Sequence, residues 1–128
     1  MDMGMTKKLA YGYDEALEKV PAALKAEGFG VLTSVDMKET LKAKLGVDFR
    51  RYIILGACNP PFAHRALSKH LGFGLLMPCN VTIYEGDDGK AVVQAVDPML
   101  SVAPKVGPEL AELAGEVRAK LEKALALM

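Results

Sequence analysis

The sequence predicts an α+β fold: a two-layer α/β sandwich in which helices pack on one face of a mixed sheet of about five strands. The 128 residues, 51% of them hydrophobic, are enough for one core, so we expect a single domain over residues 1–128. Short apolar runs alternate with segments of helical periodicity in the order β-α-β-α-β-α-β-β-α. This alternation predicts parallel crossovers, and the turn 86–89, Gly-Asp-Asp-Gly, adds one antiparallel hairpin.

The chain begins with a predicted strand over residues 7–11. Asp14 is a suitable N-cap for a helix that runs to about Glu27, and Gly28 ends it. A second strand is expected over residues 29–35. The apolar stripe of the helix consists of Leu17, Val20 and Leu24.

A short second helix follows, because Asp36 and Glu39 have the spacing of a capping box and Gly46 supplies a stop. Its inward-facing residues are expected to be Met37, Leu41 and Leu45. A third strand is expected over residues 51–58, because its apolar run from Tyr52 to Cys58 is typical of a central strand buried on both faces.

The second half of the chain begins with a predicted helix from Asn59 to about Leu71, with Asn59 as its cap and Pro60 in its first turn. Strands are expected over residues 75–85 and 90–96. The longest helix begins near Pro108. Its apolar stripe consists of Leu110, Leu113, Ala114, Val117, Leu121 and Leu125.

One face of this sheet should lack a covering helix. The residues expected on it are too apolar for open solvent, and a second copy of the chain is the simplest cover. They are Tyr52, Ile54, Tyr84, Val92 and Val96. The sequence therefore predicts a homodimer.

Charge and composition exclude several classes of partner. Sixteen basic residues balance sixteen acidic ones, so the basic excess of a nucleic-acid-binding protein is missing. No apolar run approaches the ~20 residues that span a bilayer, and the first residues lack the apolar core of a secretory signal. Free thiols are expected for both cysteines, and we expect a cytoplasmic protein with no membrane partner.

The candidate site lies at the end of the strand over residues 51–58. Cys58 and Asn59 stand where this strand meets a helix N-terminus, whose dipole favours a thiolate. The alternative is that Cys58 fills a small core position and Asn59 only caps the helix. Pro60 and Pro61 remove two backbone N–H donors, which argues against a phosphate site.

A second Cys-Asn step follows Met77-Pro78. Alternation along the strand places Cys79 on the core face with Leu75, Met77, Val81 and Ile83, and Asn80 on the other face. The two cysteines do not form a CxxC motif, and the histidines at 64 and 70 do not share a helix face. The sequence therefore indicates no metal site. If the two strands are neighbours, the thiols could still converge.

Three segments resemble a known family. They are Gly28-Phe29-Gly30-Val31-Leu32-Thr33 with Asp36-Met37, Ile54-Leu55-Gly56-Ala57-Cys58-Asn59-Pro60, and Gly74-Leu75-Leu76-Met77-Pro78-Cys79-Asn80-Val81. They look like the bacterial and archaeal domain-of-unknown-function family 302, with Met77 where Leu is usual. The resemblance implies a small α/β protein that forms dimers. It implies no activity and no catalytic residue, and its motif includes the positions of both Cys-Asn steps.

Three functions fit these observations. The first is a dimeric ligand-binding module with a small-molecule site near Cys58, Asn59, Cys79 and Asn80, where amide side chains could orient a ligand. The second is a redox protein or enzyme that uses Cys58 as a thiolate, although no base is evident. The third is a dimer with a purely structural or interaction role. The sequence points to no particular cofactor.

Overall fold

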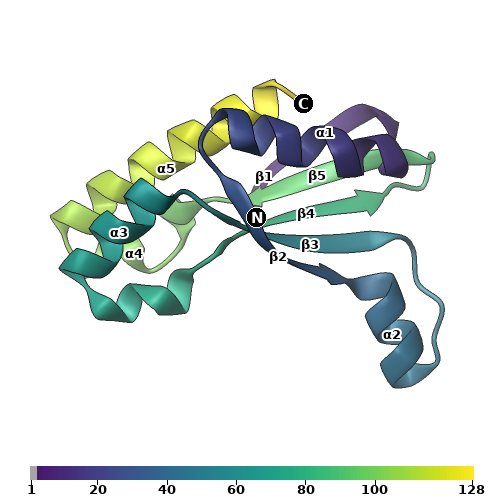
Figure 1. The fold of residues 1–128 in the computed structure, drawn as a ribbon, viewed down its shortest axis with the longest axis horizontal. Coiled ribbons are helices and arrows are strands. Elements are labelled where there is room, and N and C mark those ends of the chain that lie inside the picture. The colour runs from purple at the N-terminus through teal and green to yellow at the C-terminus, as the bar shows by residue number, and fades with distance from the viewer. Residues whose placement is uncertain (1–2) are drawn as a thin grey trace.

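The computed structural model describes residues 3–128, in which five strands form one sheet in the order β1-β5-β4-β3-β2 (Figure 1). The strands are β1 (Gly4–Gly12), β2 (Gly30–Asp36), β3 (Tyr52–Cys58), β4 (Cys79–Glu85) and β5 (Lys90–Val96). The α-helices are α1 (Tyr13–Ala26), α2 (Met37–Leu45), α3 (Pro60–Lys69), α4 (Ala103–Val106) and α5 (Pro108–Ala126). Two 3₁₀-helices, η1 (Leu71–Leu76) and η2 (Pro98–Leu100), complete the fold.

The α+β class and the layer of helices on the sheet are confirmed, but the prediction of a mixed sheet is wrong. Every neighbouring pair of strands is antiparallel. A parallel crossover requires a helix that packs on the sheet between its two strands. Here α2 and α3 lie beyond the ends of the strands (Figure 1), so the chain turns back beside the strand it has just left.

The main core lies between the sheet and helices α1 and α5. It joins side chains of α1 such as Leu24 to Ile83 and Val93 of the central strands and to Leu121 of α5, all of which are almost fully buried. These side chains drive the fold, since burying one Leu or Ile side chain contributes roughly 1.5–3 kcal/mol.

Helix α1 differs from its prediction at two residues. It begins at Tyr13, so Asp14 lies in the first turn and does not cap the helix. Leu17 is exposed, because it lies at the edge of the apolar stripe while Val20 and Leu24 face the sheet.

Helix α2 has the predicted ends and an unexpected position. Asp36 Oδ1 accepts a hydrogen bond from the Glu39 backbone N–H at 3.0 Å, and Gly46 takes the left-handed conformation at φ 67°. No residue of α2 is buried, however, and Leu45 is 69% exposed. The prediction that its apolar residues face inward is wrong for Leu45, while Met37 and Leu41 are half-buried, because the helix leaves the sheet edge and projects from it (Figure 1).

The face of the sheet opposite α1 and α5 carries four of the five apolar residues predicted for it, while the fifth, Val96, lines a cavity. Tyr52 pairs with Tyr84, and Tyr84 with Val92, so the three side chains form one row across three strands. The two tyrosine rings are stacked, with centroids 5.6 Å apart and planes inclined by 5°. Ile54 lies in the next row beside Thr82.

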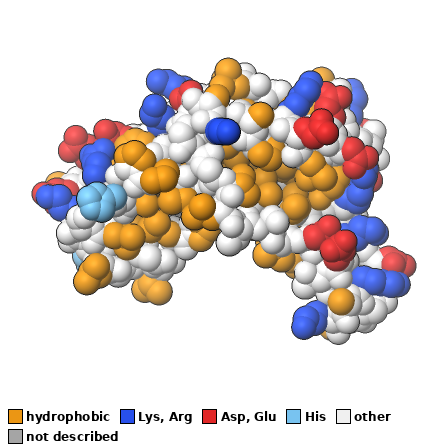
Figure 2. All heavy atoms as spheres, viewed as in Figure 1, with side chains coloured by type: hydrophobic (Ala, Val, Ile, Leu, Met, Phe, Trp, Pro, Cys, Tyr) orange, Lys and Arg blue, Asp and Glu red, His pale blue; other side chains and the backbone are white. Residues whose placement is uncertain are grey.

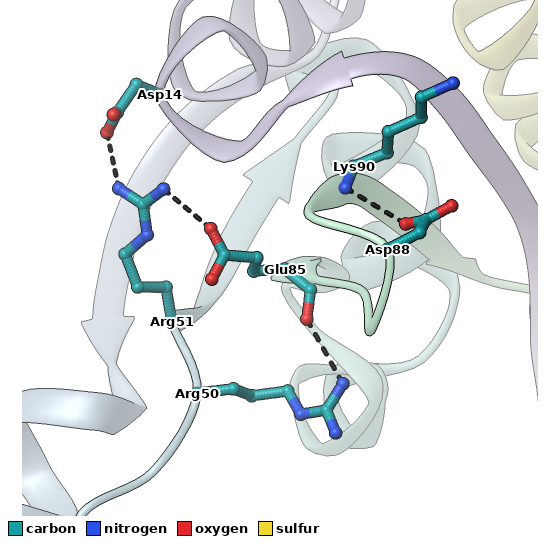
Figure 3. Close-up of polar contacts among 6 residues, drawn as sticks. All are labelled: Asp14, Arg50, Arg51, Glu85, Asp88 and Lys90. Carbon is teal, nitrogen blue, oxygen red and sulfur yellow. Dashed lines mark hydrogen bonds and ion pairs between the residues drawn. The ribbon is translucent and has the colours of Figure 1, made fainter.

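Directly before β3, Arg51 connects the sheet to α1 through two ion pairs (Figure 3). Its guanidinium donates to Asp14 Oδ1 and to Glu85 Oε2, each at 2.8 Å. The neighbouring Arg50 donates to the Glu85 carbonyl at 3.1 Å. Exposed ion pairs of this kind contribute about 0–1 kcal/mol each to the free energy of unfolding. Their main effect is therefore to position the start of β3 against α1 and the end of β4.

Candidate functional site

A cavity of about 300 Å³ opens where β3 ends and β4 begins, and all four predicted site residues line it. The four residues lie together because β3 and β4 pair in antiparallel orientation. Ala57 pairs with Cys79, and Gly56 with Asn80, so the last residues of β3 lie beside the first residues of β4. Cys58 and Asn59 follow Ala57 directly. The structure thus brings together two Cys-Asn steps that lie far apart in the sequence.

Cys79 contacts the main core beside Val81 and Ile83 as predicted, but Leu75 and Met77 do not share its strand. Strand β4 begins only at Cys79, because residues 71–76 form η1. Burial raises the pKa of the Cys79 thiol to about 11, and the nearby Cys58 thiol adds to the shift in the same direction. A thiol with this pKa is protonated at neutral pH and is a poor nucleophile.

We expect Cys79 to be alkylated slowly in the folded protein. Raising the pKa from 9.0 to about 11 lowers the thiolate fraction at pH 8 about 100-fold. In a Cys58→Ser variant, iodoacetamide should therefore modify the folded chain about 100-fold more slowly than the urea-unfolded chain. Equal rates in the two states would show that Cys79 is not held in an apolar environment.

The same shift affects stability at high pH. Between pH 9 and pH 11 the unfolded chain loses the Cys79 proton while the folded chain retains it. The free energy of unfolding should therefore fall as the pH rises through this window. Well below pH 9 the Cys79 thiol is protonated in both the folded and the unfolded state, so this group contributes no pH dependence to the free energy of unfolding.

Asn59 occupies the N-cap position of α3, as predicted, but its side chain makes no capping hydrogen bond. A capping asparagine side chain accepts a hydrogen bond from the second or third helical N–H, and Pro61 at the second position has none, which leaves only the N–H of Phe62. The side chain instead donates from Nδ2 to the Glu27 carbonyl at 3.2 Å, at the end of α1. Gly28, at φ 87°, leaves room for it, since a Cβ there would lie 3.0 Å from Asn59 Nδ2. Asn59 therefore fixes the β3–α3 corner against α1.

Asn80 differs from Asn59, because its side chain is exposed at the edge of the cavity. An amide in this position can both donate and accept a hydrogen bond. Of the two asparagines, Asn80 is the one placed to meet a molecule that enters from solvent.

Sequence reasoning missed most of the cavity wall. Three aromatic rings line it, and Phe62 contacts both the main core and a second cluster built around Leu113 of α5. The cavity thus lies at the junction of two hydrophobic clusters. The aromatic residues are Phe29, Phe62 and Phe73. Their hydrophobicity predicts burial, but no local pattern shows that α5 and η1 meet beside β3.

Within residues 3–128, no group of three or more His, Cys, Asp or Glu side chains could hold a metal ion. In that same part of the chain, no helix has the length and apolar character needed to cross a membrane.

Comparison with known proteins identifies similar chains. The family model described as domain of unknown function DUF302 matches residues 5–128. The chain is also similar to the crystal structure of uncharacterized conserved protein DUF302 from Bacillus stearothermophilus, with 31% sequence identity and a TM-score of 0.89. That similarity covers 99% of this chain and 98% of the other. A search of curated proteins finds no match.

Proposed function

This chain belongs to the DUF302 family, and we propose that it is a dimeric small-ligand-binding module whose ligand occupies the cavity between β3, β4, α3 and α5. One observation supports this function above the others. Both Cys-Asn steps line one cavity of about 300 Å³, which is at the lower end of the volume range of small-molecule sites.

The chemistry of the lining favours binding over catalysis. Apart from the two thiols, the side chains that line the cavity carry no titratable group that could act as an acid or a base. A Cys58 nucleophile would need such a base, and Cys79 is protonated at neutral pH. The thiol-dependent alternative therefore has less support.

The dimeric state is supported by the uncovered sheet face. Tyr52, Ile54 and Tyr84 present an apolar surface opposite α1 and α5, and a second copy would bury it. We place the protein in the cytoplasm, since its two cysteines are unpaired thiols. Light scattering at micromolar concentration should give the mass of a dimer, and Ile54→Arg should reduce it to that of a monomer. A monomeric wild type would refute this part of the proposal.

Ligand binding is tested by a thermal-shift screen of metabolites and metal ions. A compound present at 100 times its Kd should stabilise the wild type by about 2.7 kcal/mol. Ala63→Leu places a larger side chain in the cavity, and Asn80→Ala removes the amide at its edge. Each change should reduce the stabilisation by the compound. Ala119→Leu on the exposed face of α5 is the matched control and should bind as the wild type does.

The proposal fails if no compound in the screen stabilises the wild type. It also fails if Ala63→Leu and Ala119→Leu respond equally to every compound that does, because binding would then occur elsewhere. A role limited to dimerisation and a thiol-dependent activity of Cys58 would be the remaining interpretations.

A further inference from the structure

The wall of the cavity is uncharged. Among its lining residues there is no Asp, Glu, Lys, Arg or His side chain. A charged group that entered would lose its hydration and find no counter-charge, which carries a large free-energy cost. Cys79 does not change this, because its raised pKa keeps the thiol neutral.

Two polar side chains of the wall, those of Asn59 and Ser101, already make hydrogen bonds within the protein. Asn59 Nδ2 donates to the Glu27 carbonyl. Ser101 Oγ donates to the Pro98 carbonyl at 2.6 Å and accepts from the Ala103 N–H at 3.1 Å. The exposed amide of Asn80 is the group best placed to recognise a polar atom of a ligand.

The entrance is apolar as well. Leu75 of η1 lines the cavity and is 92% exposed, and Leu71 on the same short helix is 88% exposed. Figure 2 shows hydrophobic side chains gathered on the end of the molecule that carries α3 and α4, whereas charged side chains dominate the end that carries α2. Apolar surface is thus continuous from the cavity to the outside.

From these observations we infer that the cavity takes a neutral, largely apolar ligand, about the size of two fused aromatic rings, with a single hydroxyl or carbonyl group that pairs with Asn80. This inference rests on the proposed function and specifies its ligand class. Rings fit because three phenylalanine side chains form the wall, and aromatic pairs gain about 0.5–1.5 kcal/mol beyond their buried area.

The test uses three probes that share one ring system and differ in charge: 2-naphthol, 2-naphthoate and 2-naphthylmethylammonium. Their Kd values are measured by calorimetry at pH 7 with the wild-type protein. We expect 2-naphthol to bind about tenfold or more tightly than either ion, because burial penalises a charge. Ala63→Leu should weaken 2-naphthol binding about tenfold, Asn80→Ala should weaken it less, and Ala119→Leu should leave it unchanged.

The outcomes separate this inference from the proposed function. Tight binding of an ion that Ala63→Leu abolishes would overturn the ligand class and leave the binding function intact. Failure of 2-naphthol to bind would also overturn the ligand class, while the metabolite screen decides the binding function separately. Binding of 2-naphthol that Ala63→Leu does not affect would show that the probe binds elsewhere, and the inference would be wrong.

Discussion

Replacing Phe29 with alanine should lower the free energy of unfolding by about 3–5 kcal/mol. Phe29 is 1% exposed and is among the largest fully buried side chains of the protein. It packs in the main core and forms part of the cavity wall, so its removal loses buried area and leaves an empty space. The change is measured by urea unfolding monitored by circular dichroism.

Phe49→Ala is the matched control. Phe49 is 43% exposed and meets Tyr52 in a tilted contact with centroids 6.3 Å apart. We expect this change to cost less than about 1 kcal/mol. If Phe29→Ala costs no more than Phe49→Ala, Phe29 does not hold the core and cavity together as the structure indicates.

Gly56→Ala should lower the free energy of unfolding by about 1–3 kcal/mol, although it adds only one methyl group. A Cβ at Gly56 would lie 2.2 Å from Thr33 Oγ1 and 2.7 Å from Pro78 Cγ. The Thr33 hydroxyl can rotate away, but the Pro78 ring cannot. Because Gly56 pairs with Asn80, the strain would also move the start of β4, and ligand affinity should fall with stability.

Two further variants test this explanation. Gly30→Ala, also in a strand, meets nothing within 4 Å and should change stability by no more than about 1 kcal/mol. Thr33→Ala combined with Gly56→Ala should recover only a small part of the lost stability, since it removes the contact with Thr33 and leaves the contact with Pro78. A Gly56→Ala protein as stable as the wild type would show that β2 and Pro78 do not crowd this position.

The elements with strong local patterns could be predicted. Helix α5 begins at Pro108, as expected, and every residue of its predicted stripe is buried. Buried positions recur there at helical spacing over many turns, so the pattern alone determines the structure. For α2, the capping residues Asp36 and Gly46 predicted both ends of the helix correctly, but the predicted burial of Leu45 was wrong. Caps depend on neighbouring residues, whereas burial depends on what lies opposite the helix.

The candidate site likewise combines features that local sequence determines with features that depend on tertiary packing. The sequence by itself determined that Cys58 and Asn59 stand where a strand ends and a helix begins, because an apolar run and two prolines mark this point. It placed Cys79 and Asn80 inside a strand over residues 75–85, whereas β4 begins at Cys79. Only the tertiary structure decided that β3 and β4 are antiparallel neighbours, which brings the four residues to one cavity, and that α5 and η1 enclose it. It also decided that the Asn59 side chain donates to the Glu27 carbonyl and makes no hydrogen bond to its own helix. The physical reason is range: caps and periodicity act over a few residues, whereas pairing and enclosure depend on the burial of distant apolar surfaces against one another.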